Sequence, residues 1–368
     1  MSAMNNSIDR RDFVKIGAAA AVIGALGGSL AGCGGSASST TTASASAANI
    51  SGVTLGMLNY EDWMGSNEVS DFKKQTGCAI KQYATPDGGD SAWVKTISKN
   101  TGTYDFALAG IKVASSLNAN KLLASFDASK VANLSKVSQT YIEQFPYGIP
   151  VDQGKVGFMY NTELLPNPPK SWAELFANAS QYHQKLIFPD FDVDVIDAGL
   201  MSLGIDINTE KTSDIDAAQK AIIAIKSHIK AFIDNGGGEQ VADGSAMIAV
   251  GYDYEFAANA ADSSKIAWVS PSEGMYGYLE GWVPLASSKN LDAIYEFMNF
   301  HLETTNYADF IDTTSASWVE SDITGSLDST LSSCAALQPA DGKVTFQKKV
   351  SAEVTQAISS AYQEIQNA

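Results

Sequence analysis

The sequence predicts an α/β fold, because short strand signals alternate with helical stretches. Residues 53–57 are a short apolar run of strand length, and residues 79–83 and 104–109 also have the pattern of short strands. Between the first two, the stretch up to Gly77 has the pattern of a helix that ends at a glycine. Strands separated in this way are at least partly parallel, because parallel neighbours need a long crossover connection.

A second group of elements begins near residue 148. A proline-bearing extended segment at 148–151 precedes a strand of buried character at 156–160. Ser171 and Glu174 then form a capping box, in which the serine can accept from first-turn amides and the glutamate can reach back. We expect a helix from about Trp172.

A long apolar stripe follows. Its members recur at alternating steps of three and four residues: Ile215, Ala218, Ile222, Ile225, Ile229 and Phe232. This spacing predicts one helix that continues through Phe232 and stops at glycines 236–238, so the glycine run is interpreted as a helix stop and not as a phosphate-binding loop. The remaining predicted elements are two strands and two helices, at 247–250, 266–269, 291–302 and 344–365.

The N-terminal segment has the pattern of an export signal. Arg10 and Arg11 resemble a twin-arginine signal and precede an apolar stretch of small residues at 16–30 that is short for a membrane span. The Leu-Ala-Gly-Cys sequence that ends at Cys33 matches a bacterial lipobox, in which the cysteine thiol accepts diacylglycerol. We therefore expect residues 1–32 to be an export signal removed before Cys33; an uncleaved anchor helix is the alternative.

The segment after Cys33 is rich in Ser, Thr, Ala and Gly. Residues 34–48 have no charge and no aromatic side chain, which is the composition of a flexible tether. We expect residues 33–49 to be a lipid-anchored linker. It would hold the folded part outside the cytoplasm, in the periplasm or at the outer face of the cell membrane.

The chain is acidic, with a formal net charge of −17 over 368 residues. An acidic surface repels nucleic acid, so we expect no nucleic-acid partner. The same surface attracts cationic solutes, although solubility alone explains the charge equally well.

The sequence lacks the common catalytic signatures. It contains no HExxH, GxSxG or Walker motif, and its histidines are His183, His228 and His301. It also lacks CxxC and histidine-rich spacings, so we expect no catalytic residue, no cofactor and no metal site. Paired carboxylates of a glycoside hydrolase stay possible.

Cys78 and Cys334 are the cysteines that the lipobox does not use. Export would permit a disulfide between them, but two distant cysteines do not prove one. A disulfide and two separate thiols are both open at this point.

Several short motifs occur in an order that a known family shares. They are residues 58–63 (Leu-Asn-Tyr-Glu-Asp-Trp), 104–105 (Tyr-Asp), 148–151 (Gly-Ile-Pro-Val), 157–161 (Gly-Phe-Met-Tyr-Asn), 171–175 (Ser-Trp-Ala-Glu-Leu) and 273–284. In this order the chain resembles the extracytoplasmic solute-binding proteins of ATP-driven importers, most closely the spermidine/putrescine-binding branch.

The resemblance implies a type II periplasmic-binding-protein fold, with two α/β lobes, a ligand in the cleft between them and hinge crossings. The implied parts are a first lobe at 50–149 and 281–315, a second lobe at 150–280 with a hinge segment at each end, and a C-terminal helical segment at 316–368 that packs on the lobes.

The resemblance also implies ligand residues suited to a polyamine, whose ammonium groups need carboxylates and whose methylenes need aromatic faces. By position these are the aromatic residues Tyr60, Trp63, Tyr252 and Tyr278 and the carboxylates Asp192, Asp194 and Glu280. The acids at 190–197 could instead be a solvated cluster at a helix N-terminus. A calcium loop is a third interpretation, but the glycine and terminal glutamate of an EF-hand are missing.

Lys112 departs from the family pattern. It follows the predicted strand at 104–109, where the family often presents an uncharged polar or aromatic side chain to the cleft. A lysine there would oppose a polyamine. It therefore points elsewhere, pairs with an acid, or marks a ligand with a carboxylate or phosphonate beside its amine.

The function that the resemblance implies is capture of spermidine or putrescine, without chemistry, and delivery to the permease subunits of an ABC importer. The membrane would be a partner through the lipid anchor, and we expect a monomer. Alternatives are another small solute, such as an amino-acid-like molecule, a phosphonate or a sugar, or an exported lipid-anchored hydrolase. A chemosensory or scaffold protein with the same fold is a further alternative.

Overall fold

The computed structural model describes residues 49–61, 63–86, 89–233, 237–260, 263–339 and 343–368. The predicted export signal, Cys33 and almost all of the predicted linker lie outside these residues. Within them, no helix combines the length and the apolar character that a membrane crossing requires.

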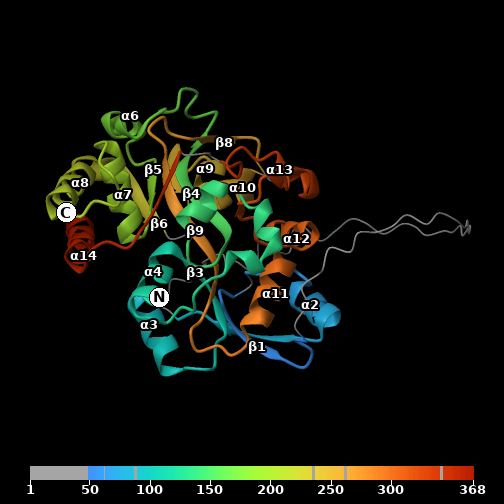
Figure 1. The fold of residues 1–368 in the computed structure, drawn as a ribbon. Coiled ribbons are helices and arrows are strands. Elements are labelled where there is room, and N and C mark those ends of the chain that lie inside the picture. The colour runs from blue at the N-terminus through green and yellow to red at the C-terminus, as the bar shows by residue number, and fades with distance from the viewer. Residues whose placement is uncertain (1–48, 62, 87–88, 234–236, 261–262, 340–342) are drawn as a thin grey trace, which may run out of the picture.

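The first lobe is a sheet covered by helices, and it lies in the lower half of Figure 1. Its first elements are β1 (Thr54–Asn59), α2 (Glu68–Thr76), β2 (Ala79–Ala84), α3 (Gly89–Lys99), β3 (Phe106–Gly110), α4 (Ile111–Ala119) and α5 (Gln139–Gln144). Strand β1 lies between β2 and β3 and is parallel to both. The predicted parallel strands are therefore confirmed, as is Gly77, which ends α2 in the left-handed conformation with φ 75°.

Two long strands join the lobes. Strand β4 (Ile149–Asn161) is antiparallel to β9 (Met275–Pro284), in a register that runs from Ile149 opposite Trp282 to Val156 opposite Tyr276. Ile149 and Trp282 belong to the hydrophobic core of the first lobe, whereas Val156 and Tyr276 belong to a separate core. The molecule is thus two-lobed, with both strands passing between the lobes (Figure 1).

The second lobe extends the same sheet in the order β4, β7, β5, β6, with β8 also paired to β4. Its elements are α6 (Trp172–Ala177), β5 (Leu186–Pro189), α7 (Asp192–Ser202), α8 (Thr212–Ile225), β6 (Ile229–Ile233), α9 (Gly238–Ala242), β7 (Ile248–Tyr252), α10 (Asp253–Ala260) and β8 (Ile266–Val269). Ser171 Oγ accepts from the Glu174 amide at 3.0 Å, which confirms the predicted start of α6.

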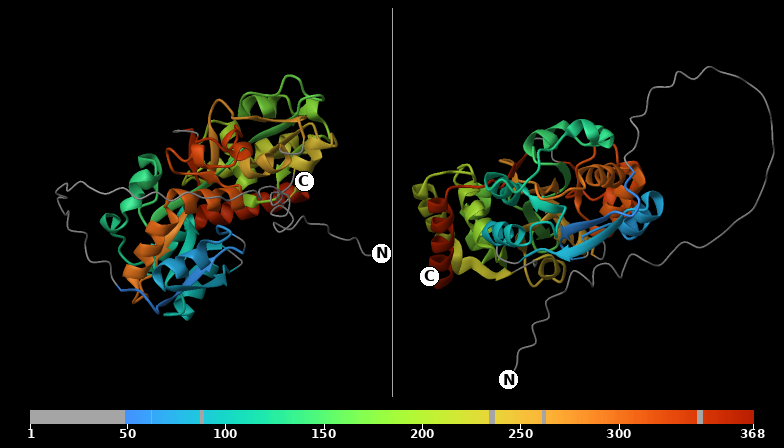
Figure 2. Two further views of the ribbon diagram at one scale, coloured as in Figure 1. Left: turned by 90° about the vertical axis from the view of Figure 1, so that its right-hand side faces the viewer. Right: turned by 60° about the horizontal axis from the view of Figure 1, so that its bottom comes forward.

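The chain after β9 contributes residues to the cores of both lobes. Its elements are α11 (Leu291–His301), α12 (Thr304–Thr314), β10 (Ser317–Trp318), α13 (Ser329–Ser332), β11 (Val344–Phe346) and α14 (Ala352–Asn367). Strand β10 pairs with β4 and β11 pairs with β9, so the segment lies along both connecting strands. Figure 2 shows α14, in red, beside the yellow and green helices of the second lobe, where it packs on α7 and α8.

The helix predicted through Phe232 is wrong in its second half. Helix α8 ends at Ile225, and Ile229–Ile233 is the strand β6, parallel to β5. The apolar spacing continues past the helix end because Ile229 is buried in the same core by strand pairing. The interpretation of glycines 236–238 as a helix stop is also wrong, because this glycine run comes after the strand β6 and Gly238 begins α9. Residues 234–236 lie outside the described residues.

Two further sequence interpretations change. The predicted helix at 344–365 begins later, because Val344–Phe346 pairs with β9 and Ser351 caps a helix that starts at Ala352. Cys78 and Cys334 are separate free thiols and form no disulfide. Cys78 is buried in the core of the first lobe.

Candidate functional site

The candidate site is built on one face of the sheet where the lobes meet. Tyr276, Tyr278 and Glu280 occupy alternate positions of β9, so they point to the same face. Val156 of β4 lies opposite Tyr276 on one side and opposite Tyr252 of β7 on the other. Tyr252 therefore shares this face with the three residues of β9.

At the first-lobe end, the structure brings Tyr60 and Glu280 together. Tyr60 Oη donates to Glu280 Oε1 at 2.9 Å, and both side chains are half-buried. Glu280 also lies opposite Gly110, the residue that precedes α4. The carboxylate thus lies between the loop after β1 and the start of α4.

Trp63 lies in the same loop as Tyr60 but has a different environment. Its backbone carbonyl accepts from Asn59 Nδ2 at 2.6 Å, and its ring meets Phe310 of α12 edge-on at 6.3 Å. The half-buried indole therefore packs against the first-lobe core. The structure does not place it in the Tyr60–Glu280 contact.

Aromatic rings line the middle of the site. The Tyr278 ring lies over Gly154 of β4, so closely that a Cβ there would be 2.2 Å from a ring atom. Tyr252 is 6.0 Å from Tyr278 between ring centroids and stacks on Tyr254 at 5.3 Å. These faces can cover methylene groups and attract a cation.

The second-lobe end is a buried carboxylate pair. Asp194 and Asp197 are both buried, one helical turn apart on α7. Gln347 Nε2 donates to both, at 3.0 Å to Asp194 Oδ1 and 2.7 Å to Asp197 Oδ2. Tyr252 Oη donates to Asp194 Oδ2 at 2.7 Å, which connects the pair to the aromatic rings.

Asp192 is placed beside this pair and not within it. Its Oδ2 accepts from Ser359 of α14 at 2.8 Å, and its Oδ1 accepts from the Val193 amide at 2.8 Å. Its side chain thus stabilises the first turn of α7 and the contact with α14. It acts on Asp194 through charge.

Burial dominates the electrostatics of the carboxylate pair. It raises the pKa of Asp194 to about 6, against the lowering effect of the hydrogen bonds from Tyr252 and Gln347. It raises the pKa of Asp197 well above its usual value, again against the bond from Gln347. The charge of Lys112 lowers the pKa of both groups, so this first-lobe lysine acts on second-lobe acids.

The sequence did not indicate Gln347. It lies just after β11, in a segment predicted to be helical. A polar residue at the end of a short apolar strand was the available signal, but only the pairing of β11 with β9 brings it to α7.

A buried ion pair stabilises the backbone next to the candidate site. Lys155 Nζ is 3.5 Å from Asp253 Oδ2, and both side chains are fully buried. Ser317 Oγ donates to the same carboxylate at 2.5 Å, and Lys155 Nζ donates to the carbonyl of Gln338 at 2.8 Å. Because Asp253 directly follows Tyr252, this network fixes the start of α10 next to the aromatic rings.

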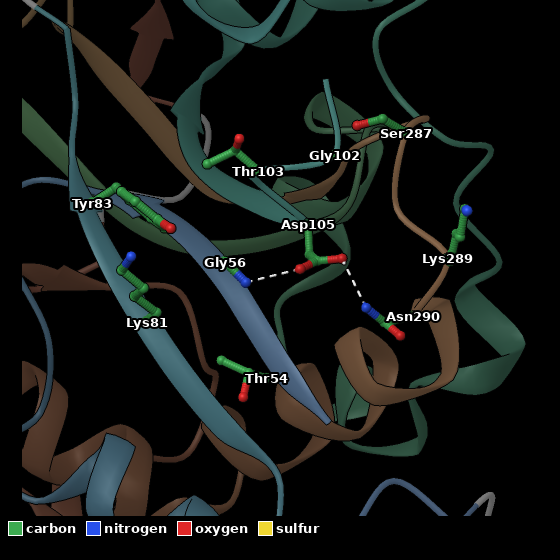
Figure 3. A pocket seen from close by; sticks show the side chains of 10 residues that line it. All are labelled: Thr54, Gly56, Lys81, Tyr83, Gly102, Thr103, Asp105, Ser287, Lys289 and Asn290. Atoms are coloured by element: carbon green, nitrogen blue, oxygen red, sulfur yellow. Dashed lines mark hydrogen bonds between the residues drawn. The ribbon is translucent and has the colours of Figure 1, made fainter. Parts of the chain in front are cut away.

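A separate polar cavity of about 330 Å³ lies against β1 and β2 of the first-lobe sheet (Figure 3). It includes Thr54, where β1 begins, whereas Tyr60 follows the end of that strand. Asp105 accepts from the Gly56 amide at 2.8 Å and from Asn290 Nδ2 at 3.1 Å in this region. None of the predicted ligand residues lines this cavity.

The histidines have ordinary partners. His301 Nδ1 is 2.6 Å from Glu68 Oε1 in the first-lobe core, and His183 Nδ1 is 3.0 Å from His228 Nδ1 near the surface. Across the described ranges, no cluster of three or more His, Cys, Asp or Glu side chains is arranged to hold a metal ion.

Comparison with known proteins gives a consistent result. Residues 68–317 match the profile of the family described as bacterial extracellular solute-binding protein. The chain is 21% identical over 257 residues to the spermidine/putrescine-binding periplasmic protein of Salmonella typhimurium. The aligned region covers 68% of this chain and 72% of that protein. It is 24% identical over 268 residues to the putrescine/cadaverine-binding protein of Pseudomonas aeruginosa, covering 68% and 75% respectively.

Solved structures share the fold. The spermidine/putrescine ABC transporter substrate-binding protein PotD from Streptococcus pneumoniae superimposes with a TM-score of 0.76 at 19% identity, covering 86% of this chain and 99% of that one. This similarity supports the two-lobed periplasmic-binding-protein architecture.

Proposed function

Because the chain belongs to the family of bacterial extracellular solute-binding proteins, we propose that it captures a polyamine and delivers it to an ABC importer. The observation that carries this proposal is the Tyr60–Glu280 contact beside the rings of Tyr278 and Tyr252. A carboxylate next to aromatic faces is the chemistry that binds an ammonium group on an alkyl chain.

The second-lobe acids extend the site in the direction of a longer ligand. Asp194 is connected to the aromatic rings through the hydroxyl of Tyr252. A ligand lying along these rings would have carboxylates at both ends, Glu280 on the connecting strand and Asp194 on α7. Closure of the lobes would then remove the ligand from water and strengthen both interactions.

Membrane attachment is part of the proposal. The motif at Arg10–Arg11 and the lipobox cysteine Cys33 support export and lipid anchoring, and residues 33–49 would serve as the tether. The protein would then act as an extracytoplasmic monomer, presenting its ligand to permease subunits in the same membrane. The lobes would comprise 50–149 with 281–315 and 150–280, with 316–368 packed on both.

Calorimetric titration of the purified protein tests the proposal directly. The panel contains spermidine, putrescine, neutral amino acids, sugars and phosphonates. We expect saturable binding of at least one amine at micromolar or lower concentration, about −8 kcal/mol or stronger. Silence with every amine, together with tight binding of a sugar or phosphonate, would contradict it.

One observation favours a second candidate class, an amine that also carries a carboxylate. Lys112 acts electrostatically on Asp194 and Asp197 from the opposite lobe. A free polyamine would bring a further positive charge to that region.

A further inference from the structure

Two histidines meet at the surface of the second lobe. His183 follows the short 3₁₀ helix Ala179–Tyr182, and His228 is the last residue of the 3₁₀ helix Lys226–His228. Their Nδ1 atoms are 3.0 Å apart, and their ring centroids are 5.3 Å apart. His183 is exposed and His228 is half-buried, so a solute can reach the two rings from solution.

This histidine pair lies at the opposite end of the second-lobe strands from the carboxylate pair. His183 comes shortly before β5 and His228 directly before β6, so both residues lie where these parallel strands begin. Helix α7, which carries Asp194 and Asp197, follows the other end of β5. Binding at the histidine pair is therefore a separate event from binding at the candidate polyamine site.

Gln184 fixes the two backbone segments that carry the histidines. Its amide donates to the carbonyl of His228 at 2.9 Å, and its Nε2 donates to the carbonyl of Ser227, also at 2.9 Å. Gln184 has φ 55°, a left-handed conformation that residues other than glycine seldom adopt. The two hydrogen bonds hold Gln184 in this conformation, so the backbone keeps the two rings close together.

The separation of the two nitrogens matches that of neighbouring ligands on one metal ion. Histidine binds divalent transition metals through a neutral ring nitrogen, at about 2.0–2.1 Å from the metal. Two such nitrogens are about 3.0 Å apart when they subtend a right angle at the metal, and about 3.4 Å apart in a tetrahedron. The observed 3.0 Å fits the right angle, which square-planar and tetragonal Cu²⁺ and Ni²⁺ ions prefer.

The charges of the protein favour a cation at this position. The formal net charge of −17 attracts divalent cations from solution. Lys226, two positions before His228, donates to the carbonyls of Ile365 and Gln366 in the last turn of α14. The negative end of that helix offsets the charge of the lysine, which reduces its repulsion of a metal ion.

We propose that His183 and His228 bind one Cu²⁺ or Ni²⁺ ion through both Nδ1 atoms, with water at the other coordination positions. The ring that now donates in the hydrogen bond between the histidines moves its proton to Nε2 by exchange with water. Both rings then stay neutral and present a lone pair on Nδ1 to the ion. The inference goes beyond the proposed function and does not depend on it.

Calorimetric titration of the full-length protein without an affinity tag tests this metal site, with CuCl₂ and NiCl₂ as the probes. The double variant His183→Gln/His228→Gln is the reference. Because His301 is buried, this variant retains no exposed histidine and measures the background from surface carboxylates. We expect wild type to bind one Cu²⁺ at least about tenfold more tightly than the double variant, a difference of about 1.4 kcal/mol.

Two further measurements assign the ligands. Each single variant, His183→Gln and His228→Gln, should lose at least about tenfold in Cu²⁺ affinity, whereas Gln181→Ala, at an exposed position near His183, should bind as wild type does. The electron paramagnetic resonance spectrum of the wild-type Cu²⁺ complex should show a tetragonal ion with two nitrogen ligands. This spectrum tests the site without any variant, so it does not depend on how the variants fold.

Wild-type Cu²⁺ affinity in either single variant would overturn the inference, as would equal affinity of wild type and the double variant. A copper spectrum with fewer than two nitrogen ligands would overturn it as well.

Discussion

The hydroxyl of Tyr60 donates a 2.9 Å hydrogen bond to Oε1 of Glu280, although 220 positions separate the two residues. Tyr60 follows β1 of the first lobe, and Glu280 lies on β9, which passes between the lobes. The position of this carboxylate therefore depends on the loop after β1 as well as on the connecting strand. Glu280 is for this reason the first residue to test.

Glu280→Gln should weaken binding of an ammonium ligand about tenfold or more. Glutamine keeps the shape of the side chain but loses the charge, and a hydrogen bond to a charged group contributes about 1.5–3 kcal/mol. Calorimetric titration with the best ligand of the wild-type protein measures the loss. Glu353→Gln, on the exposed first turn of α14, is the control and should bind as wild type does. Unchanged affinity in Glu280→Gln would exclude this residue from the site.

Gly154→Ala should displace the Tyr278 ring and reduce affinity. The added Cβ would be 2.2 Å from a ring atom, so the ring or the strand has to move. Loss of one cation–π contact amounts to roughly 0.5–2 kcal/mol, or several-fold in affinity. Combining Gly154→Ala with Tyr278→Ala removes the clash, so the second alanine should cost little further affinity. Full additivity of the two effects would argue against this contact.

The sequence was informative where the relevant pattern is local. Tyr60 directly follows a strand signal. Tyr278 and Glu280 lie two positions apart on one strand, so their spacing alone could predict that both side chains point to the same face of the sheet. Gln347 lies 153 positions after Asp194 in the sequence. Its contact with Asp194 therefore depends on the path by which the chain returns to α7, and no local sequence pattern encodes this path.

The same limit explains the errors of element assignment. The apolar spacing of α8 continues into β6 because both elements bury residues in one core, and only pairing with β5 shows where the helix stops. Lys112 illustrates the converse case. Its conflict with a polyamine was visible in the sequence, but its action on Asp194 and Asp197 required the arrangement of the two lobes.

Asp194 should make the stability of the ligand-free protein depend on pH. Its pKa is about 6 in the folded protein against 3.8 ordinarily, so folding favours its protonated form. The associated stabilisation is present below pH 3.8 and is lost as pH rises through about 6; it amounts to about 3 kcal/mol. Asp194→Asn cannot ionise and should lack this part of the pH dependence.

Urea unfolding between pH 4 and pH 7 measures the effect, since the folded-state pKa of Asp194 is about 6. Over this interval the free energy of unfolding of wild type should fall relative to that of Asp194→Asn. Parallel curves for the two proteins would show that Asp194 ionises in the folded state as it does in the unfolded chain. Cation binding should respond in the opposite sense, because it needs the ionised carboxylate and should strengthen above about pH 6.

Lys155→Met should destabilise the protein by about 3–5 kcal/mol, since it leaves the Asp253 carboxylate buried without its counter-ion. Adding Asp253→Asn removes the remaining charge, and the double variant should regain at least half of the lost stability. Urea unfolding of wild type, both single variants and the double variant gives the coupling between the two residues. A double variant as unstable as the sum of the single variants would mean that the pair is not coupled. In that case the position of α10, and with it the stacking of Tyr254 on Tyr252, would depend on other contacts, such as the hydrogen bond from Ser317 to Asp253.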